Sequence, residues 1–256
     1  MLPSVSVIIP TLDEAAHLPQ ALASVERGPG VEVIVVDGGS ADGTVQLARQ
    51  QGADRVIQSQ RSRARQMNAG AAAAQGQVLQ FLHADTRLEP GAMGALRRAM
   101  LDPRVVGGAM RLRIDSPLRR VRWVAPAVNL RTRWLKLPYG DQAIFIRRSV
   151  FEALGGFADL PILEDYDLIC RMRRVGRLVL LRSAAITSGR RWEANGLVRT
   201  TLANGLAVLL YRLGLPPQRV CAWHQRMAPA PQRHAAKDEP AFAAPPGSKA
   251  LRDAKR

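Results

Sequence analysis

The sequence predicts an α/β fold in which a mostly parallel sheet is flanked by helices and followed by a C-terminal helical extension. In the N-terminal part, short apolar runs alternate with segments of helical character, as in units with right-handed crossovers. Apolar residues make up 47% of the 256 residues, enough for one substantial core. Three acidic motifs stand where strands are expected to end, and that edge of an α/β sheet is where such folds bind ligands.

The N-terminal part is expected to contain four buried strands separated by helices. Apolar, β-branched runs bounded by Pro or Gly are typical of such strands. The strands are expected over residues 5–9, 31–36, 56–57 and 78–82. The helices are expected over residues 13–25, 44–51 and 63–74, with another between Pro90-Gly91 and about residue 101.

The pattern changes after a longer strand, which is expected over residues 105–114. Residues 118–137 are basic and contain Trp, without the earlier rhythm. Further strands are expected over 143–146, 178–181 and 184–187, and helices over 149–154, 165–175 and 193–213. Because Pro, Ala and charged residues dominate the end of the chain without periodicity, we expect one domain over 1–225 and a disordered basic tail over 226–256.

The chain is strongly basic. It has 37 Lys and Arg against 21 Asp and Glu, a formal charge of +16, which predicts attraction to phosphates or anionic lipid. It shows no zinc-finger spacing, recognition-helix pattern or RNA-binding aromatic signature, so no nucleic-acid partner is expected. The two cysteines are far apart and indicate a reducing compartment. We find no signal-peptide pattern and no uncharged run of membrane-spanning length, which predicts a cytoplasmic protein.

Two motifs at the ends of the first two strands predict a nucleotide-binding pocket. The residues concerned are Pro10, Thr11, Glu14, Asp37 and Gly39. A carboxylate at a strand end can accept hydrogen bonds from a uracil ring or ribose hydroxyls, and glycines beside it let the backbone approach the ligand. The alternative is structural: Asp13 caps a helix and residues 37–43 build a turn.

The motif His83-Ala84-Asp85 follows the fourth expected strand and predicts a divalent-metal site. Mg²⁺ and Mn²⁺ favour oxygen ligands and use one or two carboxylates together with substrate phosphates. Asp85 would coordinate the cation, with His83 as a second ligand or a phosphate contact. In the alternative, Asp85 caps a turn and His83 packs in the core.

Two basic motifs predict phosphate contacts. Arg65, together with Arg61, stands near a helix start, where the helix dipole and guanidinium groups attract phosphate. Arg190 and Arg191 could clamp a diphosphate, and Trp192 could stack on a base or sugar. The alternatives are an exposed charged helix face for the first motif and a basic helix start with a Trp anchor for the second.

The pair Glu164-Asp165 opens a helix after a loop that could present it to a cleft. A carboxylate held there could take a proton from an attacking hydroxyl. Acidic residues are also favoured in a first helical turn by the helix dipole, which explains part of this run without any catalysis.

The segment 118–137 mixes Arg, Lys, Trp and Leu. This composition suits an interfacial helix on an anionic membrane. It also suits an amphipathic helix packed on the domain, or a lid over an acceptor site.

Five motifs in a fixed order resemble glycosyltransferase family 2, which has the GT-A fold, and most closely its small bacterial subgroup labelled selenodomain-associated transferase 2. The motifs are residues 6–14, 35–44, 65–70, 81–86, and 155–157 followed by 164–168. The resemblance runs from about residue 5 to about residue 215. It implies a Rossmann-like GT-A sheet, a nucleotide-sugar donor that is usually UDP-linked, and a divalent metal, Mn²⁺ or Mg²⁺.

The resemblance also implies roles for individual residues. Asp37 would bind the nucleoside, in a pocket lined by Pro10, Thr11 and Glu14. Asp85 matches the last Asp of the family's D-x-D metal motif, whose first Asp is His83 here, so the ligand set differs. Asp165 matches the catalytic base. The processive members' Gln-x-x-Arg-Trp motif is only partly matched at residues 189–192, which argues against a polymerising synthase.

The predicted reaction is an inverting, single-displacement sugar transfer to a hydroxyl acceptor. Asp165 would remove the acceptor's proton, and the metal at Asp85, with Arg65 and Arg190 or Arg191, would stabilise the departing diphosphate. Residues 1–115 would bind the nucleotide sugar and residues 116–225 would hold the acceptor and catalyse. The donor sugar and the acceptor are not identified; a lipid-linked acceptor is a hypothesis motivated by the 118–137 and 197–213 segments.

Three other functions stay open at this point. A nucleotidyltransferase shares the nucleotide-binding core and the metal, although the Glu164-Asp165 pair speaks against it. A noncatalytic nucleotide-sugar or membrane-binding module would account for His83 but not for Asp165. A basic RNA-binding protein would show steep salt-dependent RNA affinity without competition by nucleotide.

Overall fold

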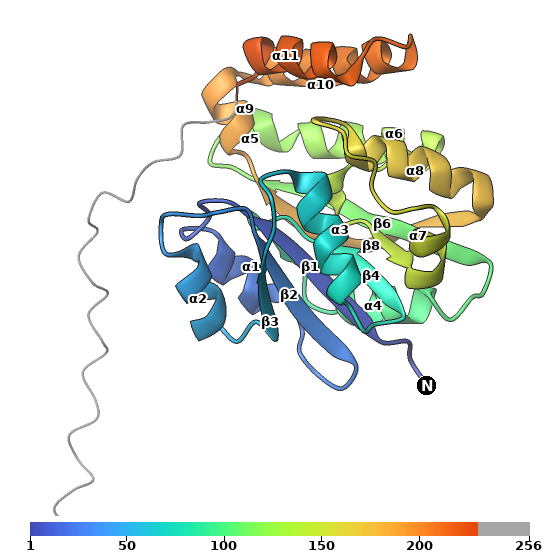
Figure 1. Ribbon diagram of the computed structural model, residues 1–256. Helices are drawn as coiled ribbons and strands as arrows, with labels where there is room; N and C mark the ends of the chain where they lie inside the picture. Colours follow the sequence, from blue (N-terminus) through green and yellow to red (C-terminus); the bar gives the residue numbers. More distant parts are fainter. Residues whose placement is uncertain (230–256) are drawn as a thin grey trace, which may run out of the picture.

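The computed structural model describes residues 1–229 and contains one eight-stranded mixed sheet with the strand order β3-β2-β1-β4-β7-β6-β8-β5. Figure 1 shows helices on both faces of this sheet and a further helical layer above its upper edge. The mostly parallel α/β architecture predicted from the sequence is confirmed. The predicted disordered tail lies outside the described residues from position 230 onward.

The N-terminal half forms the parallel part of the sheet. Its strands are β1 (Val5–Thr11), β2 (Val31–Asp37), β3 (Arg55–Gln58) and β4 (Val78–Phe81). β1 pairs in parallel with both β2 and β4, and β2 pairs in parallel with β3. The carboxyl ends of these four strands therefore lie on one edge, as the sequence pattern predicts.

The second half extends the sheet with reversals of direction. Its strands are β5 (Thr86–Leu88), β6 (Val105–Asp115), β7 (Phe145–Arg147) and β8 (Arg177–Ser188). β7 is antiparallel to β4 and β6, and β8 is parallel to β6. β6 and β8 thus run in the direction of β4, and they end at the same edge, at Asp115 and Ser188.

Two expectations about the strands are corrected. The segments 178–181 and 184–187 are one strand, because β8 stays paired with β6 on both sides of a register shift. Arg182 and Ser183 lie in this shift and have no partner in β6. The short strand β5 was not expected from the sequence. It forms at the edge of the sheet by antiparallel pairing with β8, which no local pattern in three residues could show.

The alternation of side chains along the strands builds two cores, one on each face of the sheet. The helices of the first face are α1 (Leu18–Ser24), α2 (Thr44–Gln50) and α4 (Ala92–Ala99). Those of the second face are α3 (Arg63–Ala73), α7 (Arg148–Ala153) and α8 (Glu164–Val175). In β1, Val7 and Ile9 belong to the first core and Ile8 to the second. This is the period-two pattern of a strand buried on both sides.

The first helix is shorter than expected. Helix α1 begins at Leu18, although residues 13–25 were expected to be helical. Asp13 has a left-handed backbone (φ 51°), and residues 13–17 form a loop before the helix. This loop becomes part of the site described below.

The helical layer contains α5 (Arg119–Arg122), α6 (Val124–Leu135), α9 (Arg190–Asn195), α10 (Leu197–Arg212) and α11 (Pro217–Met227). The expectation of one helix over 193–213 is wrong: Gly196 has φ 83° and ψ 149°, which separates α9 from α10. Glycine tolerates this conformation without a Cβ clash. In Figure 1, α10 and α11 lie together at the top, above α6 and α8. No helix among residues 1–229 is long and apolar enough to cross a membrane.

Candidate active site

Asp37 stands at the end of β2 and organises the loop that follows it. Its side chain is 1% exposed. Oδ2 accepts hydrogen bonds from the backbone N–H groups of Gly39 and Ser40, each at 2.9 Å. Oδ1 accepts from Ser40 Oγ at 2.5 Å and Thr11 Oγ1 at 3.3 Å. Both oxygens are thus engaged within the protein, as the turn alternative expects, and the contact of Asp37 with a nucleoside stays a prediction.

The loop after β1 is tied to the loop after β2. Asp13 N–H donates to Ser40 Oγ (2.8 Å), and Asp13 Oδ1 accepts from Ala41 N–H (2.9 Å). Glu14 N–H donates to Thr44 Oγ1 (3.0 Å). Pro10 is paired with Val36 in the adjoining strands. The predicted nucleotide-binding residues therefore form one preorganised rim at the carboxyl edge.

Gly39 lies at the open side of this rim. Its φ is +95°, and a Cβ added there would meet no atom within 4 Å. The requirement for glycine is therefore conformational, since an L side chain rarely adopts this φ. The space above Gly39 is free for a ligand to approach the backbone.

Arg190 joins the two halves of the chain at this edge. Its Nη2 lies 2.8 Å from Glu14 Oε1 and 3.0 Å from Asp85 Oδ2. Arg190 is the first residue of α9, Glu14 follows β1 and Asp85 follows β4. The structure thus brings together three residues that were predicted separately, as a nucleotide contact, a metal ligand and a phosphate clamp.

Asp165 lies in the first turn of α8, and two backbone N–H groups hold its carboxylate. Gly140 N–H donates to Oδ2 at 2.5 Å, and Tyr166 N–H donates to Oδ1 at 2.7 Å. Leu163 comes directly before α8 and has a left-handed backbone, with φ 65°. Such strain at a non-glycine residue persists only where the surroundings impose it, and it is concentrated at functional sites.

His83 and Asp165 approach each other across Gly140. A Cβ at position 140 would lie 2.9 Å from His83 Nε2 and 3.1 Å from Asp165 Oδ2. Burial, with the nearby Arg63, lowers the pKa of His83 to about 4. The imidazole is therefore neutral at pH 7, and one ring nitrogen has a free lone pair.

Glu164 holds an arginine that sequence reasoning missed. Its side chain is buried, and Oε1 lies 3.2 Å from Arg63 Nη1. Burial raises the pKa of Glu164, while Arg63 acts in the opposite direction. The predicted phosphate contact Arg65 instead pairs with Asp159 at 2.7 Å on the exposed surface. Residues two apart on a helix point to different sides, so the Arg-rich motif alone could not show which guanidinium faces the site.

Asp141 is a second residue that the sequence did not single out. It lies on a 3₁₀ turn, Gly140–Gln142, which Gln142 anchors by donating to Met110 O (3.1 Å) and accepting from Thr132 Oγ1 (3.0 Å). Its Oδ1 is buried without a hydrogen-bond partner among residues 1–229. Burial and the neighbouring Asp165 raise the pKa of Asp141 to about 6. The signal in the sequence is an Asp two residues before the expected strand 143–146.

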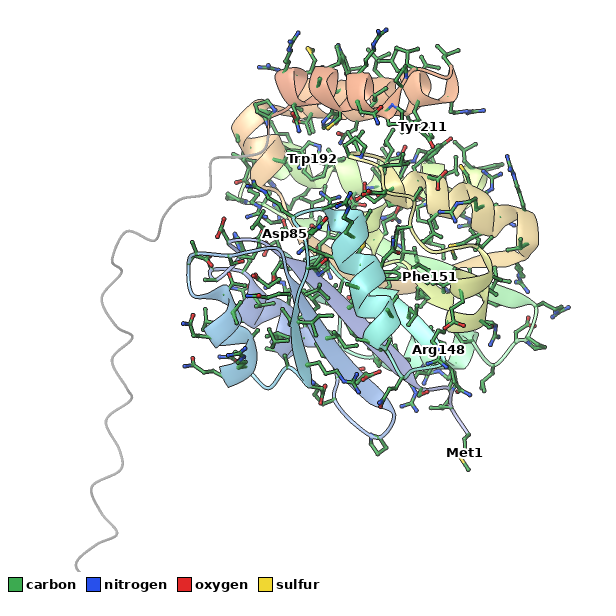
Figure 2. All side chains as sticks on the ribbon, viewed as in Figure 1. Met1, Asp85, Arg148, Phe151, Trp192 and Tyr211 are labelled. Carbon is green, nitrogen blue, oxygen red and sulfur yellow. The ribbon has the colours of Figure 1, made fainter. Side chains whose placement is uncertain are left out.

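Arg191 and Trp192 follow Arg190 on α9. Burial, with the neighbouring Arg63, lowers the pKa of Arg191. Trp192 packs against the apolar cluster beneath the helical layer, which includes Leu112 and Val121. This contact agrees with the alternative that Trp192 anchors the start of the helix; stacking on a ligand stays a prediction. Figure 2 shows Trp192 above Asp85, between the sheet edge and the helical layer.

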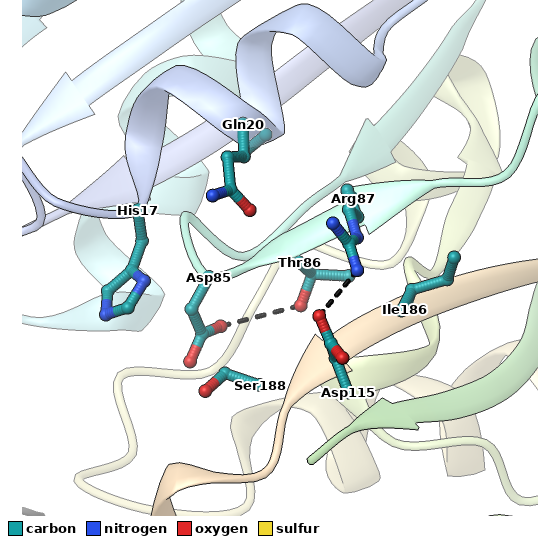
Figure 3. A pocket seen from close by; sticks show the side chains of 9 residues that line it. His17, Gln20, Asp85, Thr86, Arg87, Asp115, Ile186 and Ser188 are labelled. Atoms are coloured by element: carbon teal, nitrogen blue, oxygen red, sulfur yellow. Dashed lines mark hydrogen bonds and ion pairs between the residues drawn. The ribbon is translucent and has the colours of Figure 1, made fainter. Parts of the chain in front are cut away.

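A cavity of about 170 Å³ opens beside Asp85, on the side of α1 and β5. Figure 3 shows Asp85 between His17 and Ser188, with the ion pair of Arg87 and Asp115 at the far wall. The volume is below the usual range for a small-molecule pocket, which is about 300–1,000 Å³. The cavity therefore exposes Asp85 to a small group but does not enclose a whole ligand.

The predicted metal site is incomplete on the protein side. No group of three or more His, Cys, Asp or Glu side chains within the described chain is placed to hold a metal ion. Asp85 and the neutral His83 supply one carboxylate and one ring nitrogen. Mg²⁺ and Mn²⁺ commonly bind through one or two carboxylates plus substrate phosphates. The residues fit a cation that is shared with a bound diphosphate, once Arg190 shares or releases Asp85.

Comparison with known proteins assigns a family to this site. A family profile described as Glycosyl transferase family 2 matches residues 6–158, more than half of the chain. The uncharacterized protein MT1568 of Mycobacterium tuberculosis is 31% identical over 211 residues, which cover 71% of this chain and 63% of that protein. The PGL/p-HBAD biosynthesis glycosyltransferase of Mycobacterium bovis is 31% identical over 178 residues, which cover 66% of this chain and 69% of that protein. The chain thus spans less than two thirds of MT1568.

Two solved structures share the fold. The mannosyltransferase PcManGT of Pyrobaculum calidifontis, in complex with GDP-Man and Mn²⁺, aligns over 89% of this chain and 70% of its own, with a TM-score of 0.60 and 19% identity. The glucosyl-3-phosphoglycerate synthase of Mycobacterium tuberculosis, in complex with Mn²⁺, UDP and glucosyl-3-phosphoglycerate, aligns over 84% and 81%, with a TM-score of 0.58 and 22% identity. These likenesses confirm the predicted GT-A fold.

Proposed function

The chain belongs to glycosyl transferase family 2 and is an enzyme, and we propose that it transfers a sugar from a nucleotide diphosphate donor, first of all a UDP-sugar, to a hydroxyl acceptor. The observation that carries the proposal is the placement of Asp165. Two backbone N–H groups orient its carboxylate, and the same edge of the sheet carries Asp85, Arg190 and Arg63. The proposed base thus lies near Arg63, whose charge interacts with both Asp165 and Asp85.

The donor would lie along the carboxyl edge. The loops after β1 and β2 form the rim for its nucleoside, and Arg63, Arg190 and Arg191 supply positive charge for its diphosphate. Guanidinium groups bind phosphate oxygens with paired, charge-assisted hydrogen bonds. In this proposal residues 1–115 form most of the donor site, while residues 116–225 contribute the base, the acceptor site and the two arginines of α9.

The transfer would proceed by a single displacement with inversion. Asp165 accepts the proton of the acceptor hydroxyl as that oxygen attacks the anomeric carbon. The bond between this carbon and the diphosphate oxygen breaks, and the electron pair leaves with the diphosphate. Asp141, whose buried oxygen is unpartnered, would accept a hydrogen bond from a sugar hydroxyl.

A divalent cation would be held by Asp85, with His83 beside it. When bound, it would supply electrostatic stabilisation of the departing diphosphate. Two proteins of the same fold were solved with Mn²⁺, one with GDP-Man and one with UDP, which supports testing Mn²⁺ first. Membership of the selenodomain-associated transferase 2 subgroup remains part of the proposal.

The first test is thermal unfolding of the full chain with nucleotides and nucleotide sugars, with and without Mn²⁺ or Mg²⁺. A ligand at a hundredfold excess over its dissociation constant adds about 2.7 kcal/mol of apparent stability. A metal-dependent shift with UDP or one UDP-sugar is expected. No shift with any nucleotide, on a folded sample, would contradict the donor class and favour a noncatalytic module.

The helical layer supports a peripheral contact with an anionic membrane. Trp123 and Trp134 are 75% and 77% exposed, and Leu130 lies between them on α6. The neighbouring basic residues are Arg119, Arg120, Arg122, Arg133 and Lys136. Aromatic and apolar side chains flanked by positive charge are typical of helices that lie in a membrane interface.

Cosedimentation with anionic vesicles tests this contact. Charge reversal of Arg119, Arg120 and Arg122 should greatly weaken the binding, while the same number of reversals at the exposed residues Arg49, Arg98 and Arg182 of α2, α4 and β8 should not. Failure of the unaltered protein to bind anionic vesicles would refute the contact without affecting the proposed transfer.

A further inference from the structure

A second cavity, of about 370 Å³, lies between α8 and the C-terminal end of α10, outside the donor edge. Its walls include Tyr166 and Arg173 of α8 and Tyr211 and Arg212 of α10. In Figure 2, Tyr211 lies on the underside of α10, toward α8. The volume falls in the usual range for small-molecule sites.

The cavity is strongly positive. Arg173, Arg174 and Arg212 line it, and none of them forms an ion pair with any residue between 1 and 229. The only carboxylate in the described lining is Asp167. Its Oδ2 is already 2.8 Å from Nη2 of Arg171, which neutralises its charge. Three exposed arginines without an ion pair in the described part of the chain therefore line this space.

An aromatic row connects the cavity with the catalytic base. The rings of Tyr166 and Tyr211 meet edge to face, with centroids 6.2 Å apart, and Tyr139 follows at 6.4 Å from Tyr166. Tyr139 precedes Gly140, which donates to Asp165, and the backbone N–H of Tyr166 holds the other oxygen of Asp165. A molecule anchored in the cavity would extend along this row of rings to reach the residue that is expected to take its proton.

We propose that this cavity binds a phosphate group of the acceptor, so that the acceptor is a phosphate ester. The proposal rests on the proposed transferase function and specifies its acceptor. Planar guanidinium groups match phosphate geometry, and the tyrosine rings would cover the part of the acceptor between the phosphate and the hydroxyl. The phosphate could come from a lipid head group or from a soluble ester, since the recognition chemistry is the same.

The test is direct binding to the full chain with UDP present at saturation, so that the donor edge is already occupied. Glycerol 3-phosphate is the soluble probe. Vesicles of phosphatidylcholine containing phosphatidic acid are the lipid probe, compared with pure phosphatidylcholine vesicles. One of the two phosphate probes should bind in the cavity, and glycerol 3-phosphate binding identifies a soluble ester. For phosphatidic acid vesicles, the part of the binding that is lost when Arg173, Arg174 and Arg212 are replaced identifies a lipid, and the rest belongs to the basic segment 118–137.

The variant Arg173→Gln/Arg174→Gln/Arg212→Gln should weaken that binding by about tenfold or more, because each lost charge-assisted hydrogen bond is worth at least about one factor of ten. UDP affinity should stay within about twofold. The matched control Arg49→Gln/Arg98→Gln/Arg182→Gln removes the same charge from exposed arginines elsewhere. For a lipid source, Leu202→Ser/Leu209→Ser on the exposed side of α10 should weaken vesicle binding further.

Three outcomes would overturn the inference: neither phosphate probe binds, the triple variant binds as well as the unaltered protein, or the control loses as much affinity as the triple variant. Failure of the proposed function looks different, because the unaltered protein would then bind no UDP. The two failures are therefore read from separate measurements.

Discussion

The guanidinium of Arg190 lies 3.0 Å from the carboxylate of Asp85. This ion pair joins the start of α9 to the loop after β4, and the same guanidinium also reaches Glu14 at 2.8 Å. The protein itself therefore supplies positive charge beside Asp85. A bound diphosphate would compete with Asp85 and Glu14 for Arg190, and a cation would compete with Arg190 for Asp85. Arg190 is therefore the most informative position for testing the donor site.

Substitution of Arg190 by Gln should weaken UDP binding and strengthen Mn²⁺ binding in the absence of nucleotide. The loss of a charge-assisted contact to the diphosphate should raise the dissociation constant of UDP about tenfold. Mn²⁺ should bind more tightly because Asp85 and Glu14 lose their internal counter-charge. Isothermal titration calorimetry measures both affinities. Arg87→Gln, at the same edge but paired with Asp115, is the control, and unchanged UDP affinity in the Arg190 variant would contradict the clamp.

Asp165→Asn should abolish transfer while leaving donor binding intact. The amide keeps the size of the carboxylate but cannot accept the proton. Loss of a general base typically lowers the reaction rate by about 10²- to 10⁴-fold. Steady-state kinetics and UDP titration separate the two effects, with Asp159→Asn at the exposed surface as control. A loss of donor affinity as large as the loss of rate would show that Asp165 binds the donor instead.

Gly140→Ala should reduce activity far more than it reduces stability. The added Cβ would meet His83 Nε2 at 2.9 Å and Asp165 Oδ2 at 3.1 Å, so both side chains must move. Small misplacements of catalytic groups lower reaction rates strongly. Because two functional side chains are displaced, we expect kcat to fall about tenfold or more. Gly28→Ala, where a Cβ meets nothing within 4 Å, should be silent in the same assays.

Asp141→Asn should stabilise the fold above neutral pH and lower activity. The pKa of Asp141 is raised from 3.8 to about 6, chiefly by burial and then by Asp165. Between these values the folded protein binds more protons than the unfolded chain, so stability falls as the pH rises from about 4 to about 6. Because Asn does not ionise, the variant keeps this stability as the pH rises.

Urea unfolding at two pH values measures this effect. Since one pKa unit corresponds to about 1.4 kcal/mol, the free energy of unfolding should rise by about 1–3 kcal/mol at pH 8 and change little at pH 4. Exposed Glu152→Gln should show little change at either pH. If the variant is destabilised at pH 8, the Asp141 carboxylate has a hydrogen-bond partner in the folded state. That result would refute its role as an unpartnered acceptor.

Much of the fold follows from patterns that are local in the chain. The strands β1 and β2 are rich in apolar, β-branched residues, and β4 is a short, mostly apolar run. The parallel order of β1 to β4 follows from their alternation with helices. The helix break at Gly196 did not follow, because a single glycine is compatible with a continuous helix until packing imposes a left-handed backbone. The edge strand β5 exists only through its pairing with β8.

The candidate site divides in the same way. The sequence by itself determined the family, the strand ends near Asp37 and Asp85, and the helix start that carries Asp165. Residue type and spacing along one strand or one helical turn are local properties. Only the tertiary structure decided that Arg63 and not Arg65 meets Glu164, that Arg190 pairs with Asp85, and that Asp141 is buried beside the base. These contacts depend on how helices rotate and loops meet when the sheet closes its two cores, and that geometry is set by packing over the whole chain.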